Sequence, residues 1–395
     1  MTSETRYYLS APGLINALGA GVSQVAERLF AGDTSGMVLE DGWLPTGAAR
    51  VGRARALLPE VPDQYAQYAC RNNQLLLAAL AQIRADVESA IARFGPRRIG
   101  VVLGTSTSGI SEGEAAVLEI TRSARPGPNY HYLQQEIGMP APFLARFLGL
   151  QGPAFTVSTA CTSSAKAFAS ARNLLRHGLC DVVLVGGADS LCRLTVCGFA
   201  ALESTTTAIC NPMSRNRSGI NIGEGAALFM LTRDPTPIEL LGIGETSDAH
   251  HMSAPHPDGR GAQDAMLAAL ADASLAFSDV DYLNLHATAT PKNDEMESRA
   301  VARVFADGVA TSGTKPLTGH TLGTAGATEL AFCWLALQAG RLPPHVWDGL
   351  ADPALPSLDL VTEPRTFARA DKRVCMSNSF AFGGSNACLL IGDAR

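Results

Sequence analysis

Three residues whose side chains suit acyl-transfer chemistry stand where strands are expected to give way to helices. Cys161 lies in FTVSTACTSS (155–164), where an apolar stretch breaks into small residues before the helix-like AKAFASARNLLRHG. His286 ends the apolar run DYLNL, and His320 closes KPLTGH before TLGTAGATELAFCWLAL. A helix start presents unpaired N–H groups and partial positive charge, so the thiol in a first helical turn is expected to favour its thiolate form. One nucleophile and two imidazoles at such positions indicate acyl transfer.

The other cysteines are expected to be inert. A free cysteine is usually a small buried hydrophobe, and only Cys161 is surrounded by hydroxyl side chains at an expected strand-to-helix turn. The inert group comprises Cys70, Cys180, Cys192, Cys197, Cys210, Cys333, Cys375 and Cys388.

Composition excludes several classes of protein. With 395 residues, 46% hydrophobic and 17% charged, the chain can bury a large core and is expected to contain two domains or a duplicated one. A net charge of −6 argues against a nucleic-acid partner. The longest apolar runs, such as LLLAAL and AALFML, are far shorter than the roughly 20 residues of a membrane span.

The cysteines also bear on location and metal binding. Nine cysteines without regular spacing, and no signal-like segment after MTSETRYYLS, predict a cytoplasmic protein. Neither the pair Cys192 and Cys197 nor the doublet His250–His251 follows a zinc-ligand spacing. We therefore expect no metal and no cofactor.

Strand-like and helix-like segments alternate along the chain, which predicts an α/β protein with mixed or parallel sheets covered by helices. Strands are expected at 99–104, 181–187, 226–231, 238–244, 281–285, 373–378 and 387–392. Helices are expected around 64–94, 161–177, 260–277, 292–306 and 321–339.

The two halves of the chain echo each other weakly. One carries Cys161 and then a helix rich in small residues, and the other carries His320 and then a similar helix. If the chain is a duplication, these helices face each other and bring Cys161 close to His320. The proline-containing stretch TRDPTP (232–237) is the expected boundary, which divides the chain into residues 1–235 and 236–395.

The runs TACTSS, HATATP, KPLTGH and NSFAFGGSNA resemble, in this order, four signatures of the Cys-His-His β-ketoacyl synthases, the condensing enzymes of fatty-acid and polyketide assembly. The resemblance implies a thiolase-like fold, with two similar halves in five α-β-α-β-α layers. It also implies a decarboxylative Claisen condensation, in which an acyl group on Cys161 is attacked by the carbanion formed from a malonyl thioester. The partners it implies are an acyl carrier protein and a second subunit.

The second subunit is either another copy of the chain or a chain-length-factor-like protein. Departures from the family pattern, together with the opening YYLSAPGLINALGAG, favour a ketosynthase of a bacterial aryl-polyene-type pathway.

The resemblance also assigns roles to individual residues. The backbone amides of Cys161 and Phe382 would form the oxyanion hole, because attack on a thioester develops charge on its carbonyl oxygen. Phe382 would also gate the acyl pocket. Neutral His286 and His320 would stabilise the enolate rather than deprotonate the thiol, which leaves thiol activation to the helix start.

Four supporting residues complete the expected site. Lys315 would supply positive potential and order the site, although outside this motif it would be interpreted as a surface lysine. Glu297 would form hydrogen bonds near Lys315. Thr288 and Thr290 would bind the pantetheine arm of the substrate.

Some positions depart from the family pattern. Ala287 and Ala381 stand where glycine is common, and each adds a methyl group that could narrow the site. Ser214, Ser218 and Ile220 replace the usual aspartates and aromatic residue, so the salt bridges and packing of that stretch are in question. Basic residues for carrier docking are not evident in 58–73.

Other functions fit less well. A degradative or biosynthetic thiolase, acting on coenzyme A thioesters, is the main alternative, but it needs a second cysteine in a Cys-x-Gly turn, and Cys388 is followed by two leucines. A chalcone-type condensing enzyme would have asparagine in place of His320, and a silent chain-length subunit would lack Cys161. A cysteine protease would require a different sequence around the thiol.

Overall fold

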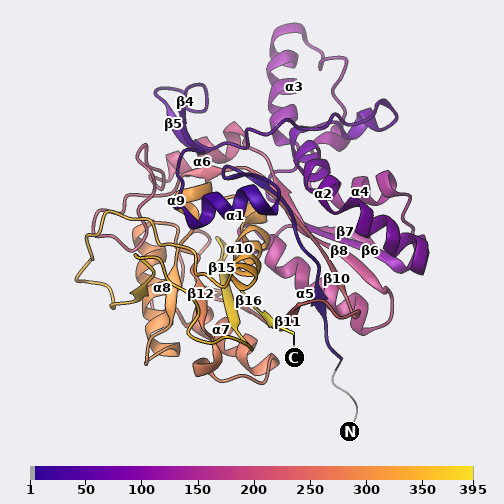
Figure 1. The fold of residues 1–395 in the computed structure, drawn as a ribbon. Helices are drawn as coiled ribbons and strands as arrows, with labels where there is room; N and C mark the ends of the chain where they lie inside the picture. Colours follow the sequence, from indigo (N-terminus) through magenta and orange to yellow (C-terminus); the bar gives the residue numbers. More distant parts are fainter. Residues whose placement is uncertain (1–4, 395) are drawn as a thin grey trace.

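The computed structural model describes residues 5–394, which form five alternating layers of helix and sheet (Figure 1). The main strands follow one hydrogen-bonded path in the order β14-β13-β12-β15-β16-β11-β1-β10-β8-β6-β7. Short β1 (Tyr8–Leu9) pairs antiparallel with both β10 and β11, and so joins two sets of strands. The five-layered arrangement expected from the resemblance is confirmed.

The first set contains β6 (Ile99–Gly104), β7 (Ala154–Val157), β8 (Val182–Asp189) and β10 (Gly225–Thr232). Beside it, β2 (Gly13–Asn16) pairs with β10, and β3 (Gly19–Ala20) pairs with β2. The second contains β11 (Ile238–Ser247), β12 (Tyr282–Asn284), β13 (Ala310–Ser312), β14 (Asp359–Leu360), β15 (Val374–Phe380) and β16 (Ser385–Asp393). A small separate sheet contains β4 (Met37–Glu40), β5 (Ala49–Gly52) and β9 (Ile222–Gly223).

The central strands are apolar on both faces because helices cover both faces. Side chains alternate along a strand. In β8, Val183 and Val185 therefore pack into the middle layer, whereas Val182 and Leu184 pack outward. This double burial explains why these strands appear in the sequence as continuous apolar runs.

The middle layer consists of α5 (Ser163–Arg176) and α10 (Ala325–Ala339), which lie between the two sets of strands (Figure 1). One outer layer contains α2 (Arg71–Phe94) and α4 (Pro140–Leu148), and the other contains α7 (Arg260–Asp272) and α8 (Pro291–Val304). Nearly all of α10 is buried, which suits a helix that is apolar on every side.

Every expected strand is present within a few residues of its expected bounds. The expected helix at 64–94 is instead two elements, the 3-10 helix η1 (Asp63–Tyr68) and then α2, because the backbone at Cys70 is extended. The helix expected at 321–339 likewise begins as the 3-10 helix η5 (Leu322–Thr324).

Several smaller elements were not expected from the sequence. They include α4, the peripheral helices α1 (Val22–Phe30), α3 (Ile110–Ser123) and α6 (Arg193–Ala201), the buried four-residue α9 (Lys315–Thr318) and the 3-10 helices Pro96–Arg98, Tyr132–Gln134 and Phe277–Asp279. Among the described residues, no helix is both long and apolar enough to cross a membrane. The division at 235/236 falls in the connection between β10 and β11 and stays a prediction.

Candidate active site

Cys161 lies on a tight turn between β7 and α5. It lies two residues before the first helical residue, Ser163, rather than in the first turn, and the preceding Ala160 has a left-handed φ of 52°. Such a backbone is costly for a residue with a side chain, and hydroxyl groups hold it in place. The hydroxyls of Ser106 and Ser163 both donate to the carbonyl of Ala160, at 3.2 and 2.5 Å. The small hydroxyl residues around the thiol therefore serve the turn that presents it.

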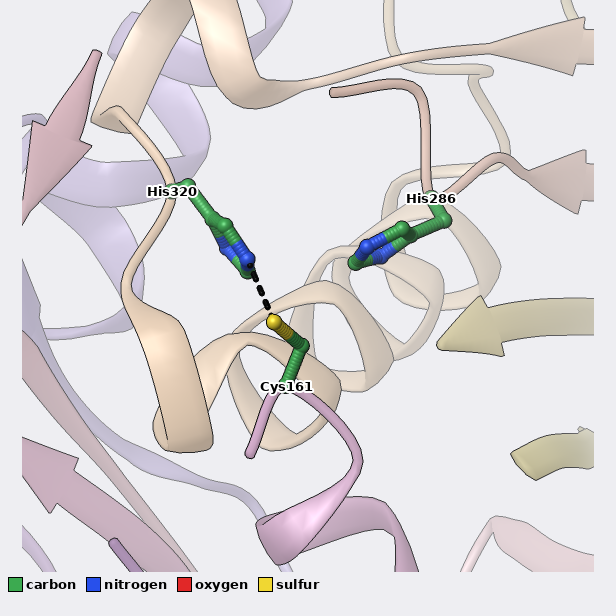
Figure 2. A group of neighbouring side chains, drawn as sticks. All are labelled: Cys161, His286 and His320. Atoms are coloured by element: carbon green, nitrogen blue, oxygen red, sulfur yellow. Dashed lines mark hydrogen bonds between the residues drawn. The ribbon is translucent and has the colours of Figure 1, made fainter. Parts of the chain in front are cut away.

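The thiol and the two imidazoles meet in a buried cluster (Figure 2). His320 Nε2 lies 2.9 Å from Cys161 Sγ. The rings of His286 and His320 are 5.3 Å apart and nearly perpendicular. One ligand-type atom from each of the three side chains lies within 4.8 Å of the others. The structure therefore brings together the three residues that the sequence suggested as the reactive centre.

Within residues 5–394, this cluster is also the only group of three or more His, Cys, Asp or Glu side chains with spacing suitable for a metal ion. The adjacent ammonium group of Lys315, described below, opposes a cation at this position. We therefore treat the cluster as an acyl-transfer site.

His286 is held by the carboxylate of Glu297. The amides of His286 and Ala287 each donate to this carboxylate at 2.7 Å. Glu297 shares one face of α8 with Asp294, which lies one turn earlier and accepts from the amide of Ala289 at 3.1 Å. These two carboxylates fix the loop that carries His286 and its left-handed residues, Ala287 (φ 40°) and Ala289 (φ 63°).

Lys315 is buried, with 1% of its surface exposed. It donates to the carbonyl of His286 and lies 3.3 Å from His286 Nδ1. Its ion-pair partner is Glu329. This residue was not expected from the sequence, although it is the single charged residue in the otherwise uncharged stretch 316–340. An isolated carboxylate in an apolar helix needs a buried cation, and Lys315 is that cation.

Burial sets the charge state of the histidines. It lowers the pKa of both His286 and His320 well below the usual value, and the nearby positive charge of Lys315 lowers both further. Both imidazoles are therefore neutral near pH 7, as the sequence analysis expected. Burial also raises the pKa of Glu297 and of Glu329 to about 7.

The thiol differs from its sequence-based expectation. Burial raises the pKa of Cys161 to about 12, although the charge of Lys315 and a hydrogen bond from the Phe382 amide both act in the opposite direction. In the resting protein the desolvation cost therefore exceeds any effect of the nearby helix start. Reaction requires local interactions to stabilise the thiolate as it forms.

Phe382 closes the site at the β15–β16 turn. Its amide faces the sulfur of Cys161, and its ring packs 5.3 Å from the ring of Phe199. Gly383 and Gly384 follow with φ of 84° and 75°, a backbone that favours glycine. Ala381, by contrast, has no positive φ, so its methyl group is accommodated without backbone strain.

Two cavities meet at the thiol. One, of about 320 Å³, is lined by both histidines and reaches the surface beside exposed Pro291 and Lys292. Thr288 and Thr290 also line it, with their hydroxyls 2.8 Å apart. A second cavity of about 270 Å³ is lined by Ser106, Ser158, Ala160, Cys161, Thr195, Phe199, Leu322 and Phe382. Cys161 and the two phenylalanine rings line both, so Phe382 stands between an entrance side and a second compartment.

The stretch 211–226, where the family's usual salt bridges were in question, is held by acids from a later loop. Ser214 donates to Asp348 at 2.8 Å, and Arg217 forms an ion pair with Asp352 at 2.5 Å. These acids come from a later loop, so the missing aspartates are compensated there. Ile220 packs with Ile222 and Leu322 in a small core beside the site.

Comparison with known proteins identifies the family. Residues 47–236 match "Beta-ketoacyl synthase, N-terminal domain", and residues 238–347 match "Beta-ketoacyl synthase, C-terminal domain". The chain belongs to the β-ketoacyl synthase family. The expected family, thiolase-like fold and acyltransferase class are thereby confirmed.

Individual relatives agree with this assignment. The protein is 46% identical to the ketosynthase ApeO of Xenorhabdus doucetiae, solved with its chain length factor ApeC, with a TM-score of 0.95 and 100% of both chains covered. It is 30% identical to the mitochondrial 3-oxoacyl-(acyl-carrier-protein) synthase of Arabidopsis thaliana, over 99% of this chain and 94% of that one. A match to Nodulation protein E of Rhizobium meliloti, at 39% identity, spans 61% of this chain and 62% of that protein.

Proposed function

We propose that this β-ketoacyl synthase condenses an acyl group held on Cys161 with a malonyl group carried by an acyl carrier protein. The observation that carries the proposal is the 2.9 Å contact between Cys161 Sγ and His320 Nε2, with neutral His286 beside it. In the first step the sulfur attacks an acyl thioester. The acyl group moves to Cys161, and the thiol proton passes to the departing pantetheine sulfur.

Three groups support the thiolate as it forms. Neutral His320 donates a hydrogen bond from Nε2–H to the sulfur, and the Phe382 amide donates a second one. Lys315 contributes positive potential. During attack, the amides of Cys161 and Phe382 receive the developing oxyanion. This arrangement requires no histidine to act as a base.

In the second step the malonyl thioester loses carbon dioxide and becomes an enolate. Lys315 has only donors, so its contact with Nδ1 of His286 puts the imidazole proton on Nε2. His286 and His320 can then both donate a hydrogen bond from Nε2–H to the enolate oxygen. The enolate carbon attacks the acyl-cysteine carbonyl, a C–C bond forms, and the cysteine leaves and takes up one proton. Thr288 and Thr290 would hold the pantetheine arm in the entrance cavity.

We also propose that the chain works in a polyene-type pathway in the cytoplasm and pairs with a chain-length-factor-like subunit. The 46% identity to ApeO over the full chain supports this choice. Strand β7 ends the sheet, and exposed apolar side chains lie on α3 and α6, including Val117 (63% exposed) and Leu194 (60%). Co-purification with and without the neighbouring gene products would distinguish the heterodimer from a homodimer.

The covalent step can be tested by intact-protein mass spectrometry after mixing with an acyl carrier thioester. We expect one acyl adduct, which is absent from Cys161→Ala and retained by Cys180→Ser, a buried cysteine remote from the cavities. An adduct that survives Cys161→Ala would contradict the assignment.

The thiolase alternative requires a separate condensation assay, because a thiolase would also form an acyl adduct on its cysteine. Cys388 lies buried within β16 and lines neither cavity, so it is not placed to act as a second reactive cysteine. Condensation of two coenzyme A thioesters without loss of carbon dioxide would favour the thiolase.

A further inference from the structure

Asp189 is a fully buried carboxylate at the end of β8, outside both cavities. A buried carboxylate costs free energy unless hydrogen bonds satisfy it. Six donors satisfy this one, and they come from two separate segments of the chain.

One oxygen, Oδ1, holds the loop between β6 and α3. It accepts from the amides of Ser106 and Thr107, at 2.7 and 2.8 Å, and from the hydroxyls of Thr105 and Thr107. Ser106 in turn donates its hydroxyl to the carbonyl of Ala160, the strained residue that immediately precedes Cys161. This oxygen is therefore connected to the turn that presents the thiol.

The other oxygen, Oδ2, holds the segment that follows His320. It accepts from the amide and the hydroxyl of Thr324, at 2.7 and 3.0 Å. Thr324 is the N-cap residue of α10, only four residues after His320, and a carboxylate is favoured at a helix N-terminus. Gly323 packs so closely on the loop of Thr105 and Ser106 that a Cβ there would lie 2.7 Å from that backbone.

We propose that Asp189 is a positioning residue that sets the separation of Cys161 and His320 by joining their two segments through one carboxylate. The proposal rests on the catalytic roles proposed above for Cys161 and His320. Asp189 forms no hydrogen bond with either residue, so it positions them through Ser106 on one side and Thr324 on the other. Its negative charge also raises the pKa of Cys161, an effect separate from positioning. An Asn side chain has one acceptor oxygen and turns an NH₂ group toward the donors on the other side. Asp189→Asn therefore breaks one of the two connections.

The test is a double-mutant cycle on malonyl-carrier decarboxylation. In an otherwise wild-type protein, Asp189→Asn is expected to lower kcat by about 10- to 100-fold with KM unchanged, because a misplacement near 1 Å can cost about 100-fold. In a His320→Ala background the same change is expected to have little further effect, because the group that it positions is gone. An equal loss in both backgrounds would overturn the proposal and leave Asp189 a purely structural residue.

Matched variants keep the test informative. Asp281→Asn removes a carboxylate that is only partly buried and accepts from the amide of Val374. Asp281 immediately precedes β12, at the end of that strand remote from His286. We expect this variant to have a lower unfolding temperature without a lower kcat. Ser106→Ala removes the hydrogen bond to Ala160 and one hydroxyl from the wall of the second cavity. It tests the same idea if Asp189→Asn does not fold, with an expected loss of acylation rate of about 3- to 10-fold relative to wild type. An unchanged acylation rate in a folded Ser106→Ala would count against the proposal. Failure of the wild-type protein to acylate Cys161 would instead refute the proposed function.

Discussion

The ammonium group of Lys315 lies 3.3 Å from Nδ1 of His286 and is paired with Glu329 in the protein interior. This relationship fixes which nitrogen of His286 carries the proton. It also means that the lysine has two separable effects, one on the tautomer of the histidine and one on the stability of the fold.

We predict that Lys315→Met lowers both stability and decarboxylation. Without Lys315 the buried Glu329 carboxyl takes up a proton and loses its hydrogen-bond partner, which is expected to cost about 1–3 kcal/mol of unfolding free energy. Loss of the donor to Nδ1 is expected to slow malonyl decarboxylation by about 100-fold or more. Urea unfolding and carbon dioxide release measure the two effects.

The double variant Lys315→Met/Glu329→Gln separates them. It removes both charges, so most of the stability should return while decarboxylation stays slow. Recovery of both properties together would mean that Lys315 serves only to neutralise Glu329.

The two histidines are predicted to contribute unequally to acylation of Cys161 and equally to malonyl decarboxylation. His286→Ala should leave acylation of Cys161 nearly unchanged, whereas His320→Ala should slow it, because only His320 contacts the sulfur. Each variant should lose about 100- to 1000-fold in decarboxylation, as expected for one lost donor to a developing oxyanion. Quenched-flow acylation and release of labelled carbon dioxide from a malonyl carrier would show the pattern. Equal loss of both steps in His286→Ala would contradict this division.

The sequence was sufficient to predict the central strands and the reactive cluster. Buried strands appear as continuous apolar runs, and the echo between the two halves indicated that Cys161 and His320 would meet. The peripheral helices α3 and α6 were missed, because their exposed apolar residues, such as Val117 and Leu194, blur the helical pattern.

Features of the site that depend on contacts between distant segments could not be predicted from the sequence. The motif placed Lys315 near the site, but its partner Glu329 lies in a helix with no motif of its own. The pKa of Cys161 depends on burial, which raises it, and on the charge of Lys315 and the amide of Phe382, which lower it. These contacts come from distant segments, so a rule about helix starts does not include them. Asp189 was missed for the same reason, because its six donors come from distant segments.

Gly313 and Ala287 are predicted to be interdependent. A Cβ placed on Gly313 would lie 2.5 Å from the methyl carbon of Ala287. Gly313→Ala should therefore destabilise the protein by about 1–3 kcal/mol, the usual cost of overpacking. Ala287→Gly in the same protein should restore most of that loss, since it removes the clashing methyl group and relieves a φ of 40°. Thermal unfolding of the two single variants and the double variant measures the coupling, and simple additivity would show that the two positions do not share this space.

His345 is predicted to make the fold sensitive to acid. Burial lowers the pKa of His345 to about 4 from the ordinary 6.5. Its Nδ1 accepts from the amide of Gly313 at 3.0 Å, and its Nε2 donates to the carbonyl of Pro212 at 3.1 Å. A proton on Nδ1 would break the first bond, two residues before Lys315. The stabilising contribution of neutral His345 is therefore complete above pH 6.5 and is lost as the pH falls toward 4.

Between pH 8 and pH 5 this histidine alone should account for about 2 kcal/mol of lost unfolding free energy. His286 and His320 are also buried and neutral, so they add acid sensitivity of the same sign, and the comparison must be made between variants. His345→Gln keeps a side-chain acceptor and a donor but cannot take up a proton. Urea unfolding at pH 8 and at pH 5 gives the loss of unfolding free energy between them, and this loss should be about 2 kcal/mol smaller in the variant than in the wild type. If the variant lost as much stability as the wild type, the acid sensitivity would have to come from other groups.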